Sequence, residues 1–326
     1  MAKLRVGLVG IGGMGGCHFG NYAEVEGAEI VAVCDVRKDM AKAKVKGKKI
    51  KVYKSLARML ANEELDMIDI CTPSYLHKDM AIKLLKAGYH VLCEKPMTLN
   101  YADAKKVLAV AKESNKKFMV AHVVRFMAPY MYLRNVIESG ELGKLLRLDM
   151  KRISSIPTWS WEDWMRDEKR SGGVCTDLSI HDIDFVQSVL GMPDKVTAYK
   201  TCIKDNSDYI VSSLTYNDTL VTCEGTWYNC SIPFKATYLA VFQNGYVELS
   251  DKLYKNGEPV VIEQPKEDAP ELDLGINVGN DNGYLAEIQY FVDCVNNDKE
   301  ITYVTPESSA RSMELVDMIK KKAIKL

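Results

Sequence analysis

The 326-residue sequence lacks a long apolar run and has almost no net charge. Without about 20 consecutive apolar residues, no segment is expected to cross a bilayer as a helix. The first residues run directly into a strand-like pattern and lack the charged, apolar and small-residue order of a signal peptide. With 43 basic and 44 acidic residues, the formal net charge is −1, so no overall field favours nucleic acid or an anionic membrane. These absences predict a cytoplasmic protein with no nucleic-acid or membrane partner.

The nine cysteines are odd in number and scattered, and none forms a CxxC pair or a cysteine/histidine set with zinc-ligand spacing. We therefore expect reduced thiols that act as small hydrophobic side chains, and no metal site. Internal repeats and low-complexity segments are also lacking. At this length, with 47% hydrophobic and 27% charged residues, the sequence predicts an ordinary globular protein of two domains. A basic segment, AKAKVKGKKIKVYK (41–54), is either a solvated surface or a binding patch.

The first motif present is a short apolar strand, KLRVGLVG, followed by the glycine turn Gly10-x-Gly12-x-x-Gly15. Such glycines allow a tight turn, let a pyrophosphate approach the backbone and let the next helix pack closely. A second strand, AEIVAVCD (28–35), ends at Asp35, whose carboxylate can accept hydrogen bonds from an adenosine ribose. Asp35 would repel a 2′-phosphate and so favours NAD, although two basic residues follow it and keep NADP as a second option.

Strand-like and helix-like segments then alternate, with strands at 65–72, 89–96 and 116–124. This alternation predicts a mostly parallel sheet, and so an α/β Rossmann dinucleotide-binding domain over residues 1–122. Ligands bind beyond the carboxyl ends of such strands. Thr72 and His77 are expected there, where a structural role is as consistent with the sequence as contact with the cofactor. The cofactor-binding candidates are Gly10, Gly12, Gly13, Met14, Gly15, Asp35, Arg37, Thr72, Pro73, His77, Glu94 and Lys95.

From residue 123 onward, short alternating strands are separated by tight turns. The pattern predicts an α+β domain over residues 123–326 with a large, mostly antiparallel sheet and one helix at about 175–190 packed against it. The C-terminal segment reads as an amphipathic helix that packs back on the body. The turns expected between strands are Asn217-Asp218, Asn244-Gly245 and Asn256-Gly257.

Both faces of the strand at 235–242 carry apolar side chains, whereas an antiparallel sheet with one solvated face should alternate cleanly. We therefore expect the outer face of this sheet to be covered in a homodimer or homotetramer.

The segment SGGVCTDLSIHDIDF (171–185) concentrates acidic residues and a histidine on an otherwise apolar predicted helix. Asp177 and His181 are four residues apart, which would put them on one helical face. The alternative without a functional role is a surface Asp–His pair that contributes a few tenths of a kcal/mol to helix stability. For Asp182 and Asp184 three roles stay open: assisting a site, capping a loop or facing water.

Together, the glycine turn with Asp35, the segment TPSYLHKDMAIKLLKAGYHVLCEKPM (72–97) and SGGVCTDLSIHDIDF resemble the Gfo/Idh/MocA oxidoreductases over essentially the whole chain. The resemblance implies a Rossmann domain followed by a domain with a large, mostly antiparallel sheet. It also implies an active-site lysine in Glu-Lys-Pro, and an aspartate and a histidine on one helix of the second domain. By motif these are Lys95, Asp177 and His181. Ser171 stands where the family often has a third glycine.

These three side chains suit the oxidation of a secondary alcohol, which loses a hydride to nicotinamide and a proton to a base. His181 can take the proton at neutral pH, Asp177 can hold the imidazole, and Lys95 can bond the reacting hydroxyl. Aromatic faces suit the C–H side of a sugar ring, although a tryptophan-rich loop more often serves packing. Further substrate-binding candidates are Arg125, Trp159, Trp161, Trp164 and Tyr284.

We therefore expect an NAD(P)-dependent dehydrogenase that acts on a CH–OH group of a sugar, cyclic polyol or sugar derivative. Two alternatives stay open. One is an enzyme that retains NAD and cleaves a glycoside by transient oxidation and elimination, without net NADH. The other is a non-catalytic, NAD-binding regulator built on the same scaffold.

Overall fold

The structure is a computed structural model that describes residues 3–202, 208–261 and 282–326. The chain divides into two compact units. The first contains the described residues up to His122 together with Tyr284–Ala310. The second contains the described residues from Val123 to 261, residues 282–283 and Arg311–Leu326. A domain boundary at 122/123 stays our proposal for the organisation of the chain, with the qualification that residues 284–310 belong to the first unit.

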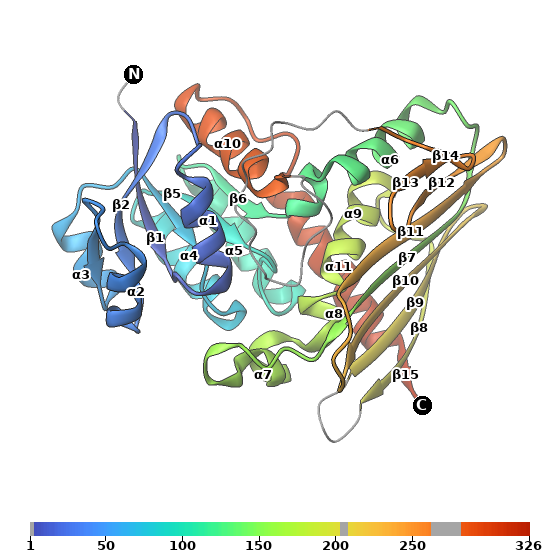
Figure 1. Ribbon diagram of the computed structural model, residues 1–326, viewed down its shortest axis with the longest axis horizontal. Helices are drawn as coiled ribbons and strands as arrows, with labels where there is room; N and C mark the ends of the chain where they lie inside the picture. Colours follow the sequence, from blue (N-terminus) through green and yellow to red (C-terminus); the bar gives the residue numbers. More distant parts are fainter. Residues whose placement is uncertain (1–2, 203–207, 262–281) are drawn as a thin grey trace. The chain divides into compact units, whose positions relative to one another are not determined.

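A six-stranded parallel sheet forms the core of the first unit, in the order β3-β2-β1-β4-β5-β6 (Figure 1). The order changes direction between β1 and β4, which is the switch point beside which dinucleotides bind in such sheets. Every residue of β4 and of β6 is buried, as in a sheet covered on both faces. The strands are β1 (Leu4–Val9), β2 (Ala28–Cys34), β3 (Lys51–Tyr53), β4 (Met67–Ile70), β5 (His90–Glu94) and β6 (Phe118–Ala121).

The helices of this unit follow the strands as the sequence predicts. The predicted helix at 100–114 is confirmed, and its N-terminus is capped by Asn100, whose side chain accepts a hydrogen bond from the backbone N–H of Asp103 (2.9 Å). The predicted helix after Thr72 begins with a short 3-10 turn, Ser74–Leu76. The helices are α1 (Gly13–Asn21), α2 (Lys38–Lys44), α3 (Leu56–Asn62), α4 (His77–Lys86), α5 (Tyr101–Glu113) and α10 (Gly283–Asn296).

A nine-stranded sheet forms the second unit, in the order β14-β13-β12-β11-β7-β10-β9-β8-β15. The pairs β7/β10 and β8/β15 are parallel and the other neighbours are antiparallel, so the predicted large, mostly antiparallel sheet is confirmed. The strands are β7 (Leu145–Ser155), β8 (Lys195–Cys202), β9 (Asp208–Tyr216), β10 (Thr219–Tyr228), β11 (Lys235–Phe242), β12 (Gly245–Leu249), β13 (Leu253–Lys255), β14 (Glu258–Pro259) and β15 (Ala323–Lys325).

The turns predicted at Asn217-Asp218 and Asn256-Gly257 join neighbouring strands of this sheet, whereas the turn predicted at Asn244-Gly245 lies one residue earlier, at 243–244, and Gly245 begins β12. At the tip between β13 and β14, Asn256 and Gly257 have φ values of 53° and 84°, which are the positive values that a two-residue hairpin turn needs at both positions. Asn217 likewise has a φ of 48° between β9 and β10. Residues that tolerate positive φ therefore set the register of the sheet, as the sequence indicates.

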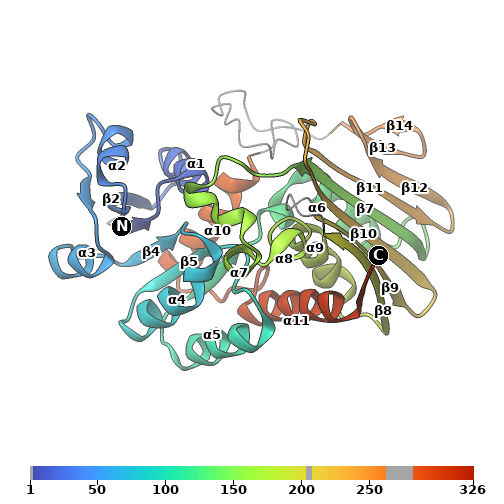
Figure 2. The same ribbon diagram turned by 90° about the horizontal axis from the view of Figure 1, so that it is seen from below.

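The helices of the second unit lie on one side of its sheet (Figures 1 and 2). Among the described elements of this unit, none covers the other side. No helix in the described part of the chain is both long and apolar enough to cross a membrane. The helices are α6 (Ala128–Ser139), α7 (Glu168–Ser171), α8 (Gly173–Asp177), α9 (Ile180–Leu190) and α11 (Pro306–Lys322), the last belonging to this unit from Arg311 on.

Candidate active site

The glycine turn lies between β1 and α1, at the carboxyl end of β1. Gly10 has a φ of +86°, and its backbone N–H donates to the carbonyl of Cys34 at the end of β2 (2.8 Å). A Cβ at Gly15 would lie 1.9 Å from the carbonyl oxygen of Gly10, so no side chain fits there. No side chain caps the N-terminus of α1, so its first N–H groups can bind an anion. The turn therefore has the shape that a pyrophosphate requires.

Asp35 is fixed at the carboxyl end of β2. Its carboxylate is only 6% exposed and accepts hydrogen bonds from the backbone N–H groups of Ile11 (3.0 Å) and Arg37 (2.8 Å). A carboxylate has about four acceptor positions, so ribose hydroxyls can still bond to it. This placement beside the glycine turn is the one that a ribose-binding acid needs.

Two cationic side chains lie against the glycine turn. The Nζ of Lys44 donates to the carbonyl of Gly12 (2.8 Å), and an Nη of Arg37 lies 3.3 Å from where a Cβ of Gly12 would be. Partial burial and the nearby guanidinium lower the pKa of Lys44. Lys44 belongs to the basic segment 41–54, so at this residue the segment contacts the glycine turn. Lys44 and Arg37 thus place positive charge next to Asp35, where the phosphate groups of a dinucleotide would bind. This arrangement is consistent with both NAD and NADP.

The Glu-Lys-Pro motif follows β5, and its Lys95–Pro96 peptide bond is cis. Lys95 is partly exposed, and its backbone N–H donates to Oε2 of Glu94 (2.9 Å). Glu94 is 5% exposed, so it belongs to the interior of the unit, and Lys95 is the more accessible charged residue of the motif.

His77 joins the loops that follow β4 and β5. Its Nδ1 lies 2.7 Å from the carbonyl oxygen of Pro96, and its Nε2 lies 2.8 Å from that of Thr72. Burial lowers the pKa of His77, so at neutral pH the ring donates to one of these carbonyls at a time. The side chain is 1% exposed, which favours the structural alternative for His77: it shapes the loop that carries Thr72 and Pro73.

The sequence did not single out His18, which is completely buried on α1. Its Nδ1 lies 2.8 Å from Oδ2 of Asp69, and its Nε2 lies 3.1 Å from Oε1 of Glu94. Within the described residues, His18, Asp69 and Cys71 are a set whose nitrogen, oxygen and sulfur atoms all lie within 4.8 Å of one another. We interpret this set as hydrogen-bonded, because the imidazole and the carboxylate bond each other directly.

In the second unit, the prediction of a single helix at 175–190 is wrong. α8 ends at Asp177 and α9 begins at Ile180, so Asp177 and His181 do not lie on one continuous helix. At the break, the N–H of Ser179 bonds the carbonyl of Val174, five residues back (2.9 Å). Ser179 packs on Gly225 of β10, where a Cβ would come within 1.8 Å of its Oγ. Asp177 and His181 are each 5% exposed.

Asp182 and Asp184 each bind a buried arginine. Asp184 accepts hydrogen bonds from Nε (2.8 Å) and Nη2 (2.7 Å) of Arg125, and Asp182 accepts from Nη2 of Arg152 (2.7 Å). All four side chains are at most 2% exposed. The guanidinium of Arg125, a predicted substrate-binding residue, is thus buried against Asp184 of α9, the helix that carries His181.

The aromatic candidates belong to different units. Trp159 is 62% exposed, and Trp161 begins a 3-10 segment, Trp161–Arg166, in the second unit. Tyr284 lies at the start of α10 in the first unit, where its ring centroid is 6.4 Å from that of His18. Trp159 has the open aromatic face that a sugar ring needs, whereas Tyr284 contacts the interior of its unit.

The fold and the glycine turn define a class, the oxidoreductases with an NAD-binding Rossmann fold. Residues 4–122 match the family described as "Oxidoreductase family, NAD-binding Rossmann fold", and residues 130–237 match the GFO/IDH/MocA C-terminal domain. The chain belongs to the Gfo/Idh/MocA family, which confirms the resemblance seen in the sequence.

Similar proteins of this family act on sugars and polyols. A myo-inositol 2-dehydrogenase of Thermotoga maritima is 29% identical over 191 residues, 58% of this chain and 55% of that protein. A 2,7-anhydro-N-acetylneuraminate hydratase of Mediterraneibacter gnavus is 32% identical over 201 residues, 60% of this chain and 52% of that protein. The chain therefore spans about half the length of the curated relatives it matches.

The same fold is found in solved structures. The WlbA dehydrogenase of Bordetella pertussis, crystallised with NADH and UDP-GlcNAcA, has a TM-score of 0.82 to this chain at 21% sequence identity. The match covers 98% of this chain and 95% of that one. At this identity the likeness establishes the fold of both units.

Proposed function

We propose that the protein is an NAD(P)-dependent oxidoreductase that transfers a hydride between nicotinamide and a secondary alcohol of a sugar, cyclic polyol or sugar derivative. The observation that carries the proposal is the glycine turn with Asp35 fixed beside it, in a chain of an oxidoreductase family. The inositol dehydrogenase and hydratase relatives support a polyol or sugar substrate.

The residues of the first unit fit NAD. The backbone N–H groups at the start of α1 would hold the pyrophosphate, Asp35 the adenosine ribose, and Lys44 and Arg37 any further phosphate charge. When bound, nicotinamide accepts or gives the hydride. The remaining chemistry is a proton transfer and the stabilisation of charge on the alcohol oxygen.

We assign these two tasks to the motif residues. Lys95 donates a hydrogen bond to the reacting hydroxyl and stabilises the negative charge that develops on its oxygen. His181 accepts the hydroxyl proton, and Asp177 holds the imidazole or passes the proton on. Trp159 and Trp161 are proposed to contact the apolar side of the substrate ring.

A substrate panel tests this function. Wild-type protein is incubated with inositols, glucosides and nucleotide sugars, each with NAD and separately with NADP, and NAD(P)H formation is followed by absorbance. We expect turnover with at least one polyol or sugar, and with NAD at least as well as with NADP. Absence of reduced cofactor with every compound would overturn simple dehydrogenation.

The hydratase relative supports the second candidate, in which NAD is used and regenerated within one catalytic cycle. In that case the purified protein retains its cofactor, and a glycoside or anhydro-sugar is converted without net NADH. Mass spectrometry of the released cofactor and chromatography of the sugar products separate this outcome from dehydrogenation. Cofactor binding with no conversion of any compound would indicate the regulator instead.

We also propose that the protein works in the reducing environment of the cytoplasm. The eight cysteines whose side chains the structure describes are free thiols, six of the eight being buried and only Cys230 exposed. A reducing compartment keeps such thiols unpaired. Proposed partners are small molecules and further copies of this chain, with no nucleic acid and no membrane.

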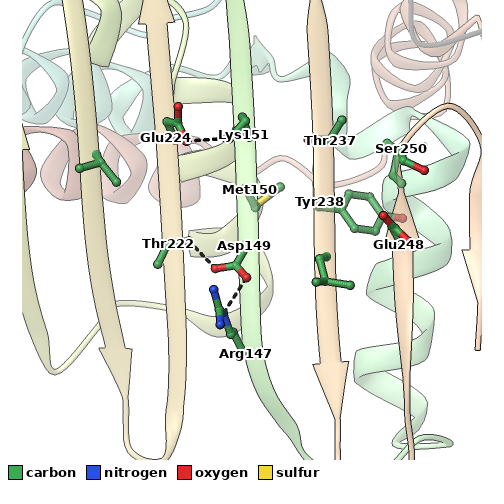
Figure 3. Close-up of a pocket in the computed structure, with 13 residues that line it drawn as sticks. Arg147, Asp149, Met150, Lys151, Thr222, Glu224, Thr237, Tyr238, Glu248 and Ser250 are labelled. Carbon is green, nitrogen blue, oxygen red and sulfur yellow. Dashed lines mark hydrogen bonds and ion pairs between the residues drawn. The ribbon is translucent and has the colours of Figure 1, made fainter.

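The uncovered side of the nine-stranded sheet is our proposed interface between copies. It mixes apolar side chains with charges that are paired within the sheet (Figure 3): Lys151 binds Glu224 (2.9 Å), and Arg147 binds Asp149 (2.6 Å). Pairing neutralises the charges, so the surface does not repel a second copy. Apolar residues whose register places them on the same side are Tyr199, Val211, Leu220, Leu239 and Val241.

We expect light scattering to give a dimer or tetramer mass for the wild type. Leu220 is 42% exposed, and Leu220→Glu should shift the mass toward the monomer by putting an unpaired charge into the interface. Met131→Glu is the matched control, because Met131 is similarly exposed (41%) but lies on α6, on the helix-covered side of the sheet. A wild-type mass equal to one chain at all concentrations contradicts this prediction.

A further inference from the structure

A cluster of ionisable side chains is buried in the first unit behind the Glu-Lys-Pro motif. It brings together His18 of α1, Asp69 of β4, Glu94 of β5 and Glu287 of α10. Three of them are 0% exposed and Glu94 is 5% exposed. Buried charges are costly unless they are paired, so this arrangement requires a physical account.

His18 bridges two carboxylates. Its Nδ1 faces Oδ2 of Asp69 (2.8 Å), and its Nε2 faces Oε1 of Glu94 (3.1 Å). Ionised carboxylates only accept hydrogen bonds, so both contacts are satisfied when both ring nitrogens carry a proton. Burial by itself would lower the pKa of His18, but the charge and hydrogen bond of Asp69 raise it well above its usual value. The ring is therefore an imidazolium between two anions.

The chain of hydrogen bonds continues in both directions. The hydroxyl of Tyr22 donates to the same Asp69 oxygen (3.2 Å), and burial raises the pKa of Tyr22, which keeps it a donor. At the other end, Oε2 of Glu94 accepts from the backbone N–H of Lys95 (2.9 Å). Burial works against ionisation of Glu94, but the hydrogen bond and charge of His18, together with the charge of Lys95, hold the pKa of Glu94 below its usual value. One oxygen of Glu94 thus binds the core, and the other binds the residue proposed to contact substrate.

Glu287 differs from the other two acids. Its Oε1 is 4.0 Å from Nε2 of His18, and within the described residues neither of its oxygens has a hydrogen-bond partner. Burial raises the pKa of Glu287 well above its usual value. Glu287 is therefore a neutral carboxylic acid. The charged groups of the cluster are the His18 cation and the Asp69 and Glu94 anions.

We propose that His18 and Glu94 are positioning residues for Lys95, with the imidazolium anchoring the Glu94 carboxylate to Asp69 so that Glu94 fixes the backbone of Lys95. The inference rests on the proposed function only for its kinetic consequence. A displacement of about 1 Å at a reacting group is enough to cost about 100-fold in rate, so an anchor on the backbone of Lys95 acts on turnover through geometry. Glu287 takes no part in this anchor.

Two substitutions of the same chemistry separate the anchor from its neighbour. Glu94→Gln exchanges one of two acceptor oxygens for a donor, so it breaks the bond either to His18 or to the Lys95 N–H. Glu287→Gln exchanges a neutral acid for a neutral amide of the same shape. With a substrate found by the panel, we expect Glu94→Gln to lower kcat about 10- to 100-fold, with KM for substrate changed less than kcat. Glu287→Gln should leave kcat within about twofold, since nothing in the proposed anchor is lost.

A measurement on the protein itself does not depend on turnover. The amide proton of Lys95 donates to a carboxylate, so its NMR resonance should move in Glu94→Gln and in His18→Gln, and stay in place in Glu287→Gln. Correlation of the His18 ring nitrogens should show both protonated at neutral pH in the wild type. The dissociation constant of NAD, measured by calorimetry, should stay within about threefold in His18→Gln and Glu287→Gln, because neither residue is among the predicted cofactor-binding residues.

An unmoved Lys95 amide in Glu94→Gln, or a singly protonated His18 ring, overturns the positioning proposal whatever the substrate. Equal losses of kcat in Glu94→Gln and Glu287→Gln also overturn it, since they indicate a general disturbance of the buried cluster. If the panel yields no substrate, the proposed function fails, and the two NMR observations still decide the anchor.

Discussion

Arg125→Met is expected to lower the free energy of unfolding by about 3–5 kcal/mol, because it strands the carboxylate of Asp184 in the interior. Both side chains are 1% exposed, and two hydrogen bonds of 2.7 and 2.8 Å join them. Ser312 of α11 also donates to Asp184 (2.7 Å), but one hydroxyl does not replace a cation. The size of the effect comes from the charge that is left behind, and much less from the strength of the pair itself.

The double variant Arg125→Met with Asp184→Leu should recover most of this loss, because it removes both charges and fills the space with apolar atoms. Urea unfolding followed by circular dichroism gives the comparison. Lys106→Met is the control: its pair with Asp103 (2.7 Å) is at the surface, with Lys106 64% exposed, and should cost less than about 1 kcal/mol. A single variant that unfolds like the wild type, or a double variant no better than the single, contradicts the argument.

These ion pairs answer why a core-packing helix is so acidic, and the sequence could not supply that answer. The arginine partners lie 59 residues from Asp184 and 30 residues from Asp182, so no local period or spacing relates them. The cluster around His18 has the same origin, since its carboxylates are 51 and 76 residues away. His18 lies in the last turn of α1, and nothing in the local sequence indicates its partners.

What the sequence did predict depends on forces that act over a few residues. Continuous apolar runs indicate the buried parallel strands, and the two Asn-Gly pairs indicate the reversals between β11 and β12 and between β13 and β14. The glycine turn and Asp35 were found because their roles require particular backbone geometry at a set spacing. The division between α8 and α9 was missed because its cause, Ser179 against Gly225, is a contact between a helix end and a distant strand. Sequence reasoning thus located the motif residues but not the side chains that hold them.

His181→Asn and Lys95→Met are each expected to lower kcat about 100- to 10,000-fold on the substrate found by the panel. Asparagine keeps a polar group at position 181 but cannot take up a proton, and methionine keeps the length of Lys95 without its charge. Affinity for NAD should change by less than about threefold in His181→Asn, because His181 is not among the predicted cofactor-binding residues. Lys95 is among them, so Lys95→Met is judged by kcat. Stopped-flow measurement of NADH formation and calorimetry of cofactor binding check the two parts of this prediction.

The double variant Lys95→Met with His181→Asn tests whether the two residues act together. If Lys95 and His181 act on the same alcohol in one step, removing the second group after the first should cost little more, because effects of residues that act as a unit are far from additive. Independent roles would instead multiply, so that two losses of 1,000-fold become about a million-fold. Lys95→Arg is a useful companion, since it keeps a positive charge but places it on a longer, planar group. Recovery of kcat in Lys95→Arg would mean that a positive charge alone suffices at this position. A kcat as low as that of Lys95→Met would mean that the substrate hydroxyl needs a donor at one defined place, which is what an anchored Lys95 backbone provides.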